Sequence, residues 1–443
     1  MSYTPHTPQE IKEMLKAIGV SSIDELFSDI KKELRPKSFN IPEGKSEQEV
    51  LRYFKELGAR NNTGLVSFLG AGFYDHYIPS VVDALAGRPE FYTAYTPYQP
   101  ECSQGWLQAI YEYQSAICEL TGLDASNASL YDGGTALYEA AMMAVRLTGK
   151  KKILVDCGLN PVYRGMLYTY TSNLSLEFAE IPVVHGQSCR RTLASHLDEN
   201  TAAVVLQNPN FFGAIDDLSD MAEKARAKGA LVIASVNPLS LGILKTPAEM
   251  GVDIAVGEGQ SLGLPLSFGG PYLGFMACRK EFVRQMPGRI VGATVDKDAR
   301  RGFVLTLQTR EQHIRREKAT SNICSNEALC ALRALIYLSI IGKAGLVELA
   351  KLNFHKAEFA KSLLEKIPGV EVKRSSPTFN EFTVLLPKDA GGVVNKMIDK
   401  GFAAGFPLGR FYKGMENYLL VAVTEKRTKE EITGFCEALK EVL

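Results

Sequence analysis

The chain has 443 residues, and its 50 lysines and arginines are balanced by 50 aspartates and glutamates. A formal net charge of zero argues against a nucleic-acid-binding protein, and 46% apolar with 23% charged residues is typical of a globular protein. The longest apolar run, Ala334 to Ile341, is far shorter than the roughly 20 residues that cross a bilayer, and the N-terminus lacks a signal pattern, so we expect a cytoplasmic protein without membrane partners.

The first 65 residues are expected to form a helical arm. Two segments have amphipathic helical periodicity, SSIDELFSDIKKEL (21–34) and SEQEVLRYFKELGARN (46–61). Ser22 with Glu25, and Ser46 with Glu49, have the spacing of a capping box at a helix start. Because short helices are marginal alone, we expect this arm to pack on a partner or on the rest of the chain.

Residues 66–324 are expected to form a large α/β domain. Helical segments alternate with short β-rich runs, at 151–158, 201–210, 229–238, 252–259 and 272–279. This alternation indicates βα units and a mainly parallel sheet.

Residues 325–443 are expected to form a smaller α+β domain. Two helical segments (326–341 and 345–367) lead into two strand-like runs, EFTVLLP (381–387) and YLLVAVTE (418–425). A closing helix is predicted over 429–443, where KEEITGFCEALKEVL has helical periodicity.

A proline-rich loop, YTAYTPYQPE (92–101), carries three tyrosines within seven residues. Their rings and hydroxyls suit a planar, anionic ligand, with Tyr95 and Tyr98 as candidates. A buried aromatic interface is the equally acceptable alternative. Trp106, nearby, is interpreted as a packing residue.

A second candidate lies before the predicted helix ALYEAAMMAVR, where Asp132 is followed by Gly133, Gly134 and Thr135. Free N–H groups and the helix dipole make such a start an anion site, a cup for phosphate. Simple capping of the helix is the alternative, and taken alone it is favoured. The scattered cysteines and histidines have no metal-ligand spacing, so no metal site is expected.

Several long motifs resemble the glycine-cleavage P-protein family, glycine decarboxylase: YTPYQPE, SQG, ELTGLDASNASLYDGGTA, GQSLGLPLSFGGPYLG and LQTREQHIRREKATSNIC. The resemblance covers almost the whole chain, and its length fits the first subunit of the two-subunit form. It implies the α/β fold of the aspartate-aminotransferase group of pyridoxal-phosphate (PLP) enzymes. That fold has a large domain with a mixed seven-stranded sheet and a smaller C-terminal α+β domain, and its active sites lie between subunits.

Two features that such a PLP site needs are missing from this sequence. The carboxylate that pairs with the pyridinium nitrogen is absent from the end of LVIASVNP (231–238). At the position of the Schiff-base lysine stand Gln260 and Ser261, and the neighbouring lysines are excluded by their positions. We therefore expect no catalytic residue in this chain alone, a vestigial cup at Gly133–Thr135, and PLP held covalently by a partner subunit.

The resemblance also implies the partners and the reaction. A PLP-bearing second subunit, two copies of each chain, substrate glycine and the lipoylated H-protein are expected. The enzyme would decarboxylate glycine and pass the aminomethyl group to the lipoyl arm. Tyr95, Tyr98, Thr320 and Ser321 are the candidates for reaching the partner's site, with an ordinary charged helix as the alternative around Thr320.

Two rival functions remain open from the sequence. The chain is either a subunit that completes the partner's active site or a scaffold pseudoenzyme that only stabilises the partner. An independent PLP enzyme using an unexpected lysine is the third reading, and Gln260 argues against it.

Overall fold

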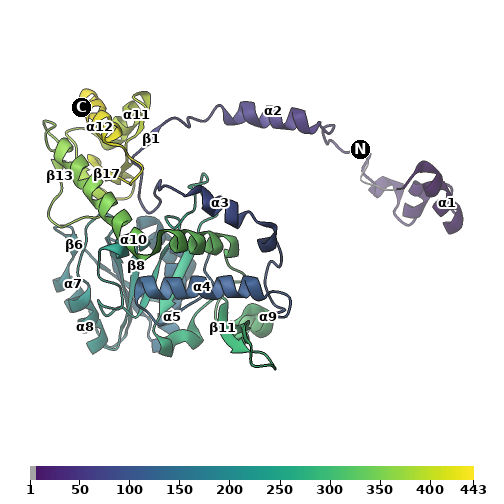
Figure 1. Cartoon of the computed structure of the whole chain (residues 1–443), viewed down its shortest axis with the longest axis horizontal. Coiled ribbons are helices and arrows are strands. Elements are labelled where there is room, and N and C mark those ends of the chain that lie inside the picture. Colours follow the sequence, from purple (N-terminus) through teal and green to yellow (C-terminus); the bar gives the residue numbers. More distant parts are fainter. Residues whose placement is uncertain (1–5) are drawn as a thin grey trace. The chain divides into compact units, whose positions relative to one another are not determined.

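The computed structural model describes residues 6–443 and separates the chain into two units, one up to Thr63 and one from Gly64 to Leu443 (Figure 1). The first unit contains α1 (Pro8–Ile18), η1 (Ile23–Phe27), η2 (Lys32–Leu34) and α2 (Glu47–Gly58). The predicted helix at 46–61 is confirmed, including its capping box at Ser46. A further capping box at Thr7 starts α1, a helix that the sequence analysis missed.

The helix predicted at 21–34 is wrong, because this segment forms only the short 3-10 turns η1 and η2. Ser22 makes no capping bond to the backbone, and Arg35 donates from its side chain to the carbonyls of Phe27 and Ile30. These carbonyls would accept the bonds of a continuous helix, so Arg35 competes with its extension.

The seven-stranded mixed sheet predicted for the second unit is confirmed, with strand order β2-β10-β9-β8-β7-β3-β4. The neighbours from β9 to β4 run parallel, whereas β10 is antiparallel to both β9 and β2. Its strands are β2 (Ala125–Ser126), β3 (Lys152–Asp156), β4 (Glu177–Ile181), β7 (Thr201–Asn208), β8 (Leu231–Val236), β9 (Ile254–Glu258) and β10 (Gly274–Cys278). All five β-rich runs named above therefore form strands.

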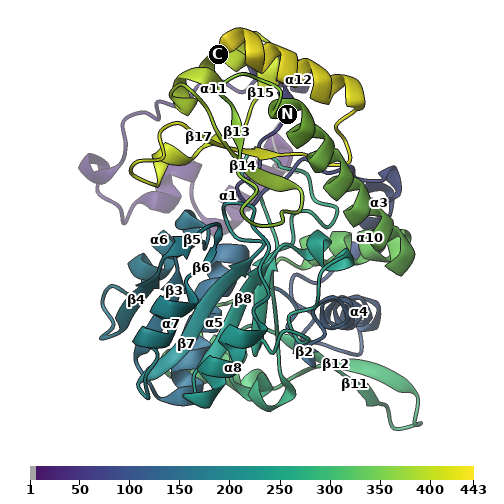
Figure 2. The same cartoon turned by 90° about the vertical axis from the view of Figure 1, so that its left-hand side faces the viewer.

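Helices cover both faces of this sheet (Figure 2). Alternate side chains of a buried strand point to opposite faces: Leu154 belongs to one apolar core, whereas Ile153 and Val155 belong to the other. The helices of this region are α3 (Ser80–Ala86), α4 (Gln104–Thr121), α5 (Gly133–Thr148), α6 (Pro161–Thr171), α7 (Arg190–His196) and α8 (Ser219–Ala227). Trp106 is buried on α4 against Phe91, as expected of a packing residue.

Several shorter strands and helical turns lie outside the large sheet. They are η3 (Pro89–Phe91), β5 (Val183–Val184), β6 (Gln187–Ser188), η4 (Pro238–Gly242), η5 (Lys280–Gln285), β11 (Ile290–Val295), β12 (Arg301–Thr306), η6 (Gln308–Arg310), α9 (Gln312–Arg315) and η7 (Arg316–Lys318). The strands β11 and β12 pair as an antiparallel hairpin.

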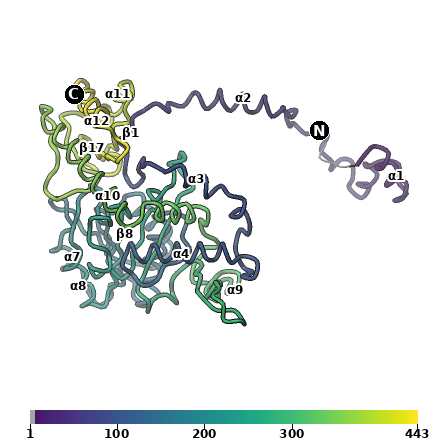
Figure 3. Tube along the Cα trace, viewed as in Figure 1, coloured from purple at the N-terminus to yellow at the C-terminus, as the bar shows by residue number. Residues whose placement is uncertain are grey.

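A long helix, α10 (Ala328–Leu364), runs from the large sheet to the C-terminal region, as the trace in Figure 3 shows. Gly342 has a positive φ of 58° and kinks it between the two predicted helical segments. Ala331 and Ala334 belong to a core on the large sheet, whereas Ala357 and Ala360 belong to the C-terminal core. By length and composition α10 could cross a membrane, but its place in two apolar cores indicates a helix of the protein interior.

The C-terminal core is formed by a four-stranded sheet of order β13-β14-β17-β16 and by helices α11 and α12. Phe68 joins this core, because β1 pairs with β15. The predicted division into 66–324 and 325–443 stays a prediction. The elements are β1 (Val66–Ser67), β13 (Glu371–Val372), β14 (Glu381–Leu385), α11 (Ala390–Asp399), β15 (Phe402–Ala403), β16 (Phe406–Pro407), η8 (Leu408–Arg410), β17 (Tyr418–Ala422) and α12 (Lys429–Val442).

Candidate functional site

A cavity of about 40 Å³ lies at the carboxyl ends of the parallel strands, the edge where ligands bind in open α/β sheets. Such a space has room for a few water molecules. Its lining comes from the ends of β7, β8 and β9, from α6, from the loop before α3 and from the start of β14: Gly72, Tyr74, Asn160, Tyr163, Gln207, Pro209, Asn210, Gly213, Ser235, Val236, Asn237, Pro238, Glu258, Ser261, Phe379, Asn380 and Glu381.

The predicted cup at the start of α5 is filled by carboxylates of this same chain. Thr135 donates from its backbone N–H to Asp132 Oδ1 at 2.8 Å and from its hydroxyl to Oδ2 at 3.0 Å. The N–H of Gly133 donates to Glu258 Oε2 at 3.0 Å. The structure thus brings Gly133, Gly134 and Thr135 together at a helix start, and two acidic side chains take the N–H groups that a phosphate would need.

Glu258, at the end of β9, is the residue that the sequence analysis missed. Burial raises the pKa of its carboxyl to about 8, although three backbone N–H groups, of Leu273, Gly133 and Gln260, oppose the shift. The Oε1 atom accepts from Gln260 at 2.9 Å and from Leu273 at 3.0 Å. One sequence signal could have identified Glu258: it is an acidic residue at the end of the apolar run VDIAVGEG (252–259), where a buried charge is costly.

Gln260, at the position expected for the lysine, is 2% exposed, and both polar atoms of its side chain are hydrogen-bonded. Its Oε1 accepts from the N–H of Tyr74 at 2.9 Å, and its Nε2 donates to the carbonyls of Tyr74 (3.1 Å) and Leu264 (2.8 Å). Asn237, where a carboxylate was expected, caps η4 through its side chain. No lysine of residues 6–443 lines the cavity, so these residues do not fit PLP.

A second buried acid, Glu381 of β14, closes the cavity from the C-terminal region. It accepts from the N–H of Ala71 at 2.6 Å and from the hydroxyl of Tyr74 at 2.9 Å. Burial raises the pKa of Glu381 to about 7 against the effect of both bonds. A side chain on Gly70 would overlap Glu381 Oε1 and come within 2.7 Å of Ala422 Cβ, so glycine is required there for the close approach.

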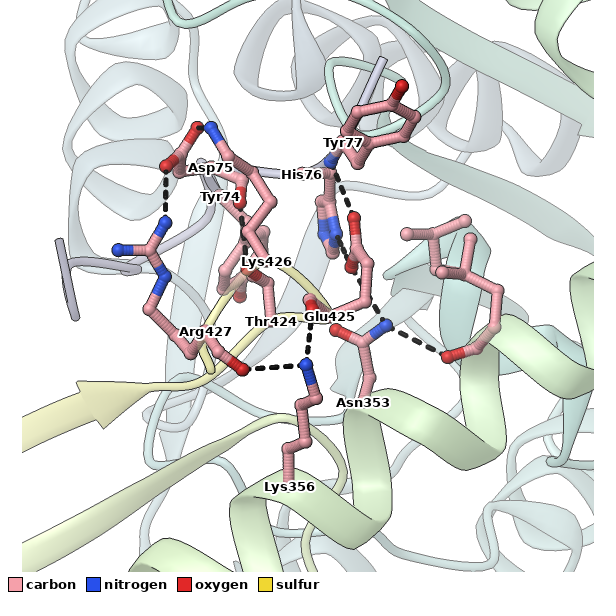
Figure 4. Close-up of polar contacts among 12 residues, drawn as sticks. Tyr74, Asp75, His76, Tyr77, Asn353, Lys356, Thr424, Glu425, Lys426 and Arg427 are labelled. Atoms are coloured by element: carbon pink, nitrogen blue, oxygen red, sulfur yellow. Dashed lines mark hydrogen bonds and ion pairs between the residues drawn. The ribbon is translucent and has the colours of Figure 1, made fainter. Parts of the chain in front are cut away.

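A polar network fixes the loop 74–77, which carries Tyr74 into this site (Figure 4). Glu425 accepts from Asn353 and from the N–H of Tyr77, and pairs with His76 at 2.8 Å. Burial by itself raises the pKa of Glu425, but the bond to His76 and its charge reverse this and lower it to about 2. Asp75 adds an ion pair with Lys426 at 2.6 Å.

The tyrosine loop forms a separate polar cluster with the segment after β10. Tyr98 accepts at its hydroxyl from Arg289 Nη2 at 3.0 Å, and its ring lies 5.3 Å from that of His313. Arg289 is 4% exposed, and its Nε lies 3.7 Å from Glu311 Oε2. In the part of the chain described, Arg289 Nε and Nη1 make no hydrogen bond. Tyr95 is 80% exposed.

Thr320 and Ser321 lie in a small cleft beside Glu311, the same residue that faces Arg289. The N–H of Thr320 donates to the carbonyl of Arg310 at 3.0 Å, and Ser321 Oγ donates to Glu139 Oε1 at 2.7 Å. Tyr98 contacts Arg289, which faces Glu311, and Glu311 lines the same cleft as Thr320 and Ser321. Within residues 6–443 no comparable contact links Tyr95 to this cleft. None of the described His, Cys, Asp and Glu side chains form a metal-binding group.

The family model of the glycine cleavage system P-protein matches residues 1–439. A probable glycine dehydrogenase (decarboxylating) subunit 1 from Geotalea uraniireducens is 60% identical over 443 residues, covering 100% of both chains. The counterpart from Maridesulfovibrio salexigens is 56% identical, covering 99% of each.

Among solved structures, glycine decarboxylase (P-protein) of the glycine cleavage system in inhibitor-bound form matches with a TM-score of 0.93 and 47% identity, covering 100% of both chains. A sphingosine-1-phosphate lyase from Burkholderia pseudomallei, 14% identical, shares the fold with a TM-score of 0.68 over 94% of each chain. From its sequence and its fold, this chain belongs to the glycine cleavage system P-protein family.

Proposed function

We propose that this chain is subunit 1 of a heteromeric glycine dehydrogenase that decarboxylates glycine and passes the aminomethyl group to the lipoyl arm of the H-protein. Family membership supports the reaction. The observation that supports the subunit's role is the cavity in which Glu258 takes the N–H of Gly133 in the expected phosphate cup, and in which Gln260 occupies the position expected for the lysine. A chain built in this way depends on a second subunit to hold PLP, and two copies of each chain form the complex in the cytoplasm.

The bound PLP would serve as an electron sink for the decarboxylation. This chain's own contribution is proposed at the cluster around Tyr98 and Arg289. The Arg289 guanidinium is nearly buried and faces Glu311, and two of its nitrogens make no hydrogen bond among the described residues, which suits a carboxylate or phosphate. We place this cluster, with Tyr95, Thr320 and Ser321, against the partner's site.

The test is trapping of PLP on the assembled complex by borohydride, followed by mass analysis of each subunit. We expect one PLP for each pair of chains, with all of it on the partner and none on this chain. A stoichiometric adduct on a lysine of this chain would show that it is a PLP enzyme in its own right.

The alternative is a scaffold pseudoenzyme, which the filled cup and the absence of lysine from the described cavity lining also suit. The two functions differ in whether the cluster around Tyr98 supports turnover. Substitutions there that leave the assembly intact distinguish them.

A further inference from the structure

Among the described residues, two acids and no opposing cation line the cavity at the carboxyl ends of the strands. Glu258 and Glu381 both line it, one from the end of β9 and one from β14. In the part of the chain that the structure describes, no lysine, arginine or histidine lines this space. Burial raises the pKa of both carboxyls, and a positive charge entering the cavity would oppose this shift by favouring their ionised forms.

Three further polar atoms on the same cavity have no hydrogen-bond partner within residues 6–443: Tyr163 Oη, Ser261 Oγ and Asn380 Nδ2. Their residues are 6%, 4% and 1% exposed. Buried polar groups are normally satisfied, and the amide nitrogen of Asn380 is a donor that needs an acceptor. Glu258 accepts three hydrogen bonds and Glu381 two, so each carboxylate keeps room for a further donor, whereas Asn380 Nδ2 has no acceptor within residues 6–443.

We propose that this cavity binds a compact molecule carrying both an ammonium group and a carboxylate, the chemistry of the smallest amino acids. The ammonium group donates to Glu381 and Glu258, and the carboxylate accepts from Asn380. The volume of about 40 Å³ restricts the ligand to a few heavy atoms. The proposal goes beyond the function above, because it assigns a ligand to this chain's own cavity and not to the partner's site.

The full chain, purified without partner and without PLP, is titrated by calorimetry with glycine, methylammonium and acetate. We expect glycine to bind more tightly than either single-charge probe. Glu381→Gln should weaken glycine binding by about tenfold or more, because a hydrogen bond to a charged group is lost. Asp253→Asn is the matched control: Asp253 is buried at the opposite end of β9 and should leave the affinity unchanged.

Asn380→Leu is an independent test, because it removes the proposed donor to the ligand and leaves Glu258 and Glu381 unchanged. It should lower the affinity for glycine to that for methylammonium and leave methylammonium binding as it is. Acetate binding as tightly as glycine, or no glycine binding at millimolar concentration by the chain with native circular dichroism, would overturn the proposal. Because neither PLP nor partner is present, a failure here is distinct from a failure of the proposed enzymatic role.

Discussion

Glu381 makes the stability of this chain depend on pH in a calculable direction. Its pKa is raised from an ordinary 4.5 to about 7 in the folded chain, so between these values the folded state holds the proton that the unfolded state releases. The free energy of unfolding therefore falls as pH rises through this window, by about 3 kcal/mol for this group.

We expect Glu381→Gln to remove this part of the pH dependence. An amide can still accept from Ala71 and pair with the hydroxyl of Tyr74, without a charge to bury. The unfolding free energy, measured in denaturant at pH 5 and pH 8, should drop less in the variant than in the wild type. The exposed Glu371→Gln serves as control, and an equal drop in all three proteins would contradict the assignment.

Gln260→Lys tests whether a lysine alone restores a cofactor site. We expect no PLP adduct after borohydride, because Glu258 still occupies the N–H of Gly133 and would also pair with the introduced amine. Absorption spectra and mass analysis of the variant provide the measurement. Stoichiometric labelling of this single variant would mean that the cup is open to phosphate despite Glu258.

At the scale of elements, the two arm helices present apolar side chains that stay exposed among the described residues of their unit. Neither α1 nor α2 has a buried residue, and Val50, Phe54 and Leu57 share one exposed face of α2. We expect Phe54→Glu to weaken assembly with the partner subunit at least tenfold while leaving the thermal midpoint of the isolated chain unchanged. Analytical ultracentrifugation measures the assembly.

The polar-face substitution Gln48→Glu on the same helix provides the control and should assemble as the wild type does. Assembly of Phe54→Glu with wild-type affinity would show that α2 takes no part in the interface.

Sequence patterns predicted elements more completely than contacts between them. Short apolar, β-rich runs located five of the seven sheet strands but not β2 and β4, and the spacing of Ser46 and Glu49 located α2, because these signals are local. The antiparallel pairing of β10 with β9 and β2 depends on tertiary structure, and the bonds from Arg35 to the carbonyls of Phe27 and Ile30 leave no trace in the helical periodicity. Likewise, Glu258 lies 125 residues from Gly133, and no periodicity reports that the two meet. The sequence was enough to name the candidate site residues. It did not reveal that Glu258 occupies the cup at Gly133, or that Arg289 contacts Tyr98.

At the scale of the whole molecule, the question is whether this chain contributes chemistry across the subunit boundary. Arg289→Lys keeps the charge but loses the planar guanidinium, whose Nη2 contacts Tyr98 and whose Nε and Nη1 make no hydrogen bond within residues 6–443. We expect the complex to assemble normally and to release carbon dioxide from glycine about tenfold to a hundredfold more slowly. Tyr98→Phe should act in the same direction with a smaller effect, because the Arg289 contact is lost while the ring stays beside His313.

The exposed Arg284→Lys, on η5, provides the matched control and should turn over as the wild type does. Sedimentation of each complex separates loss of assembly from loss of turnover. If Arg289→Lys and Tyr98→Phe both assemble and both keep full turnover, the cluster has no part in the reaction and the scaffold function is correct. A loss of turnover in assembled complexes would instead mean that a subunit without its own PLP lysine still supplies groups on which glycine decarboxylation depends.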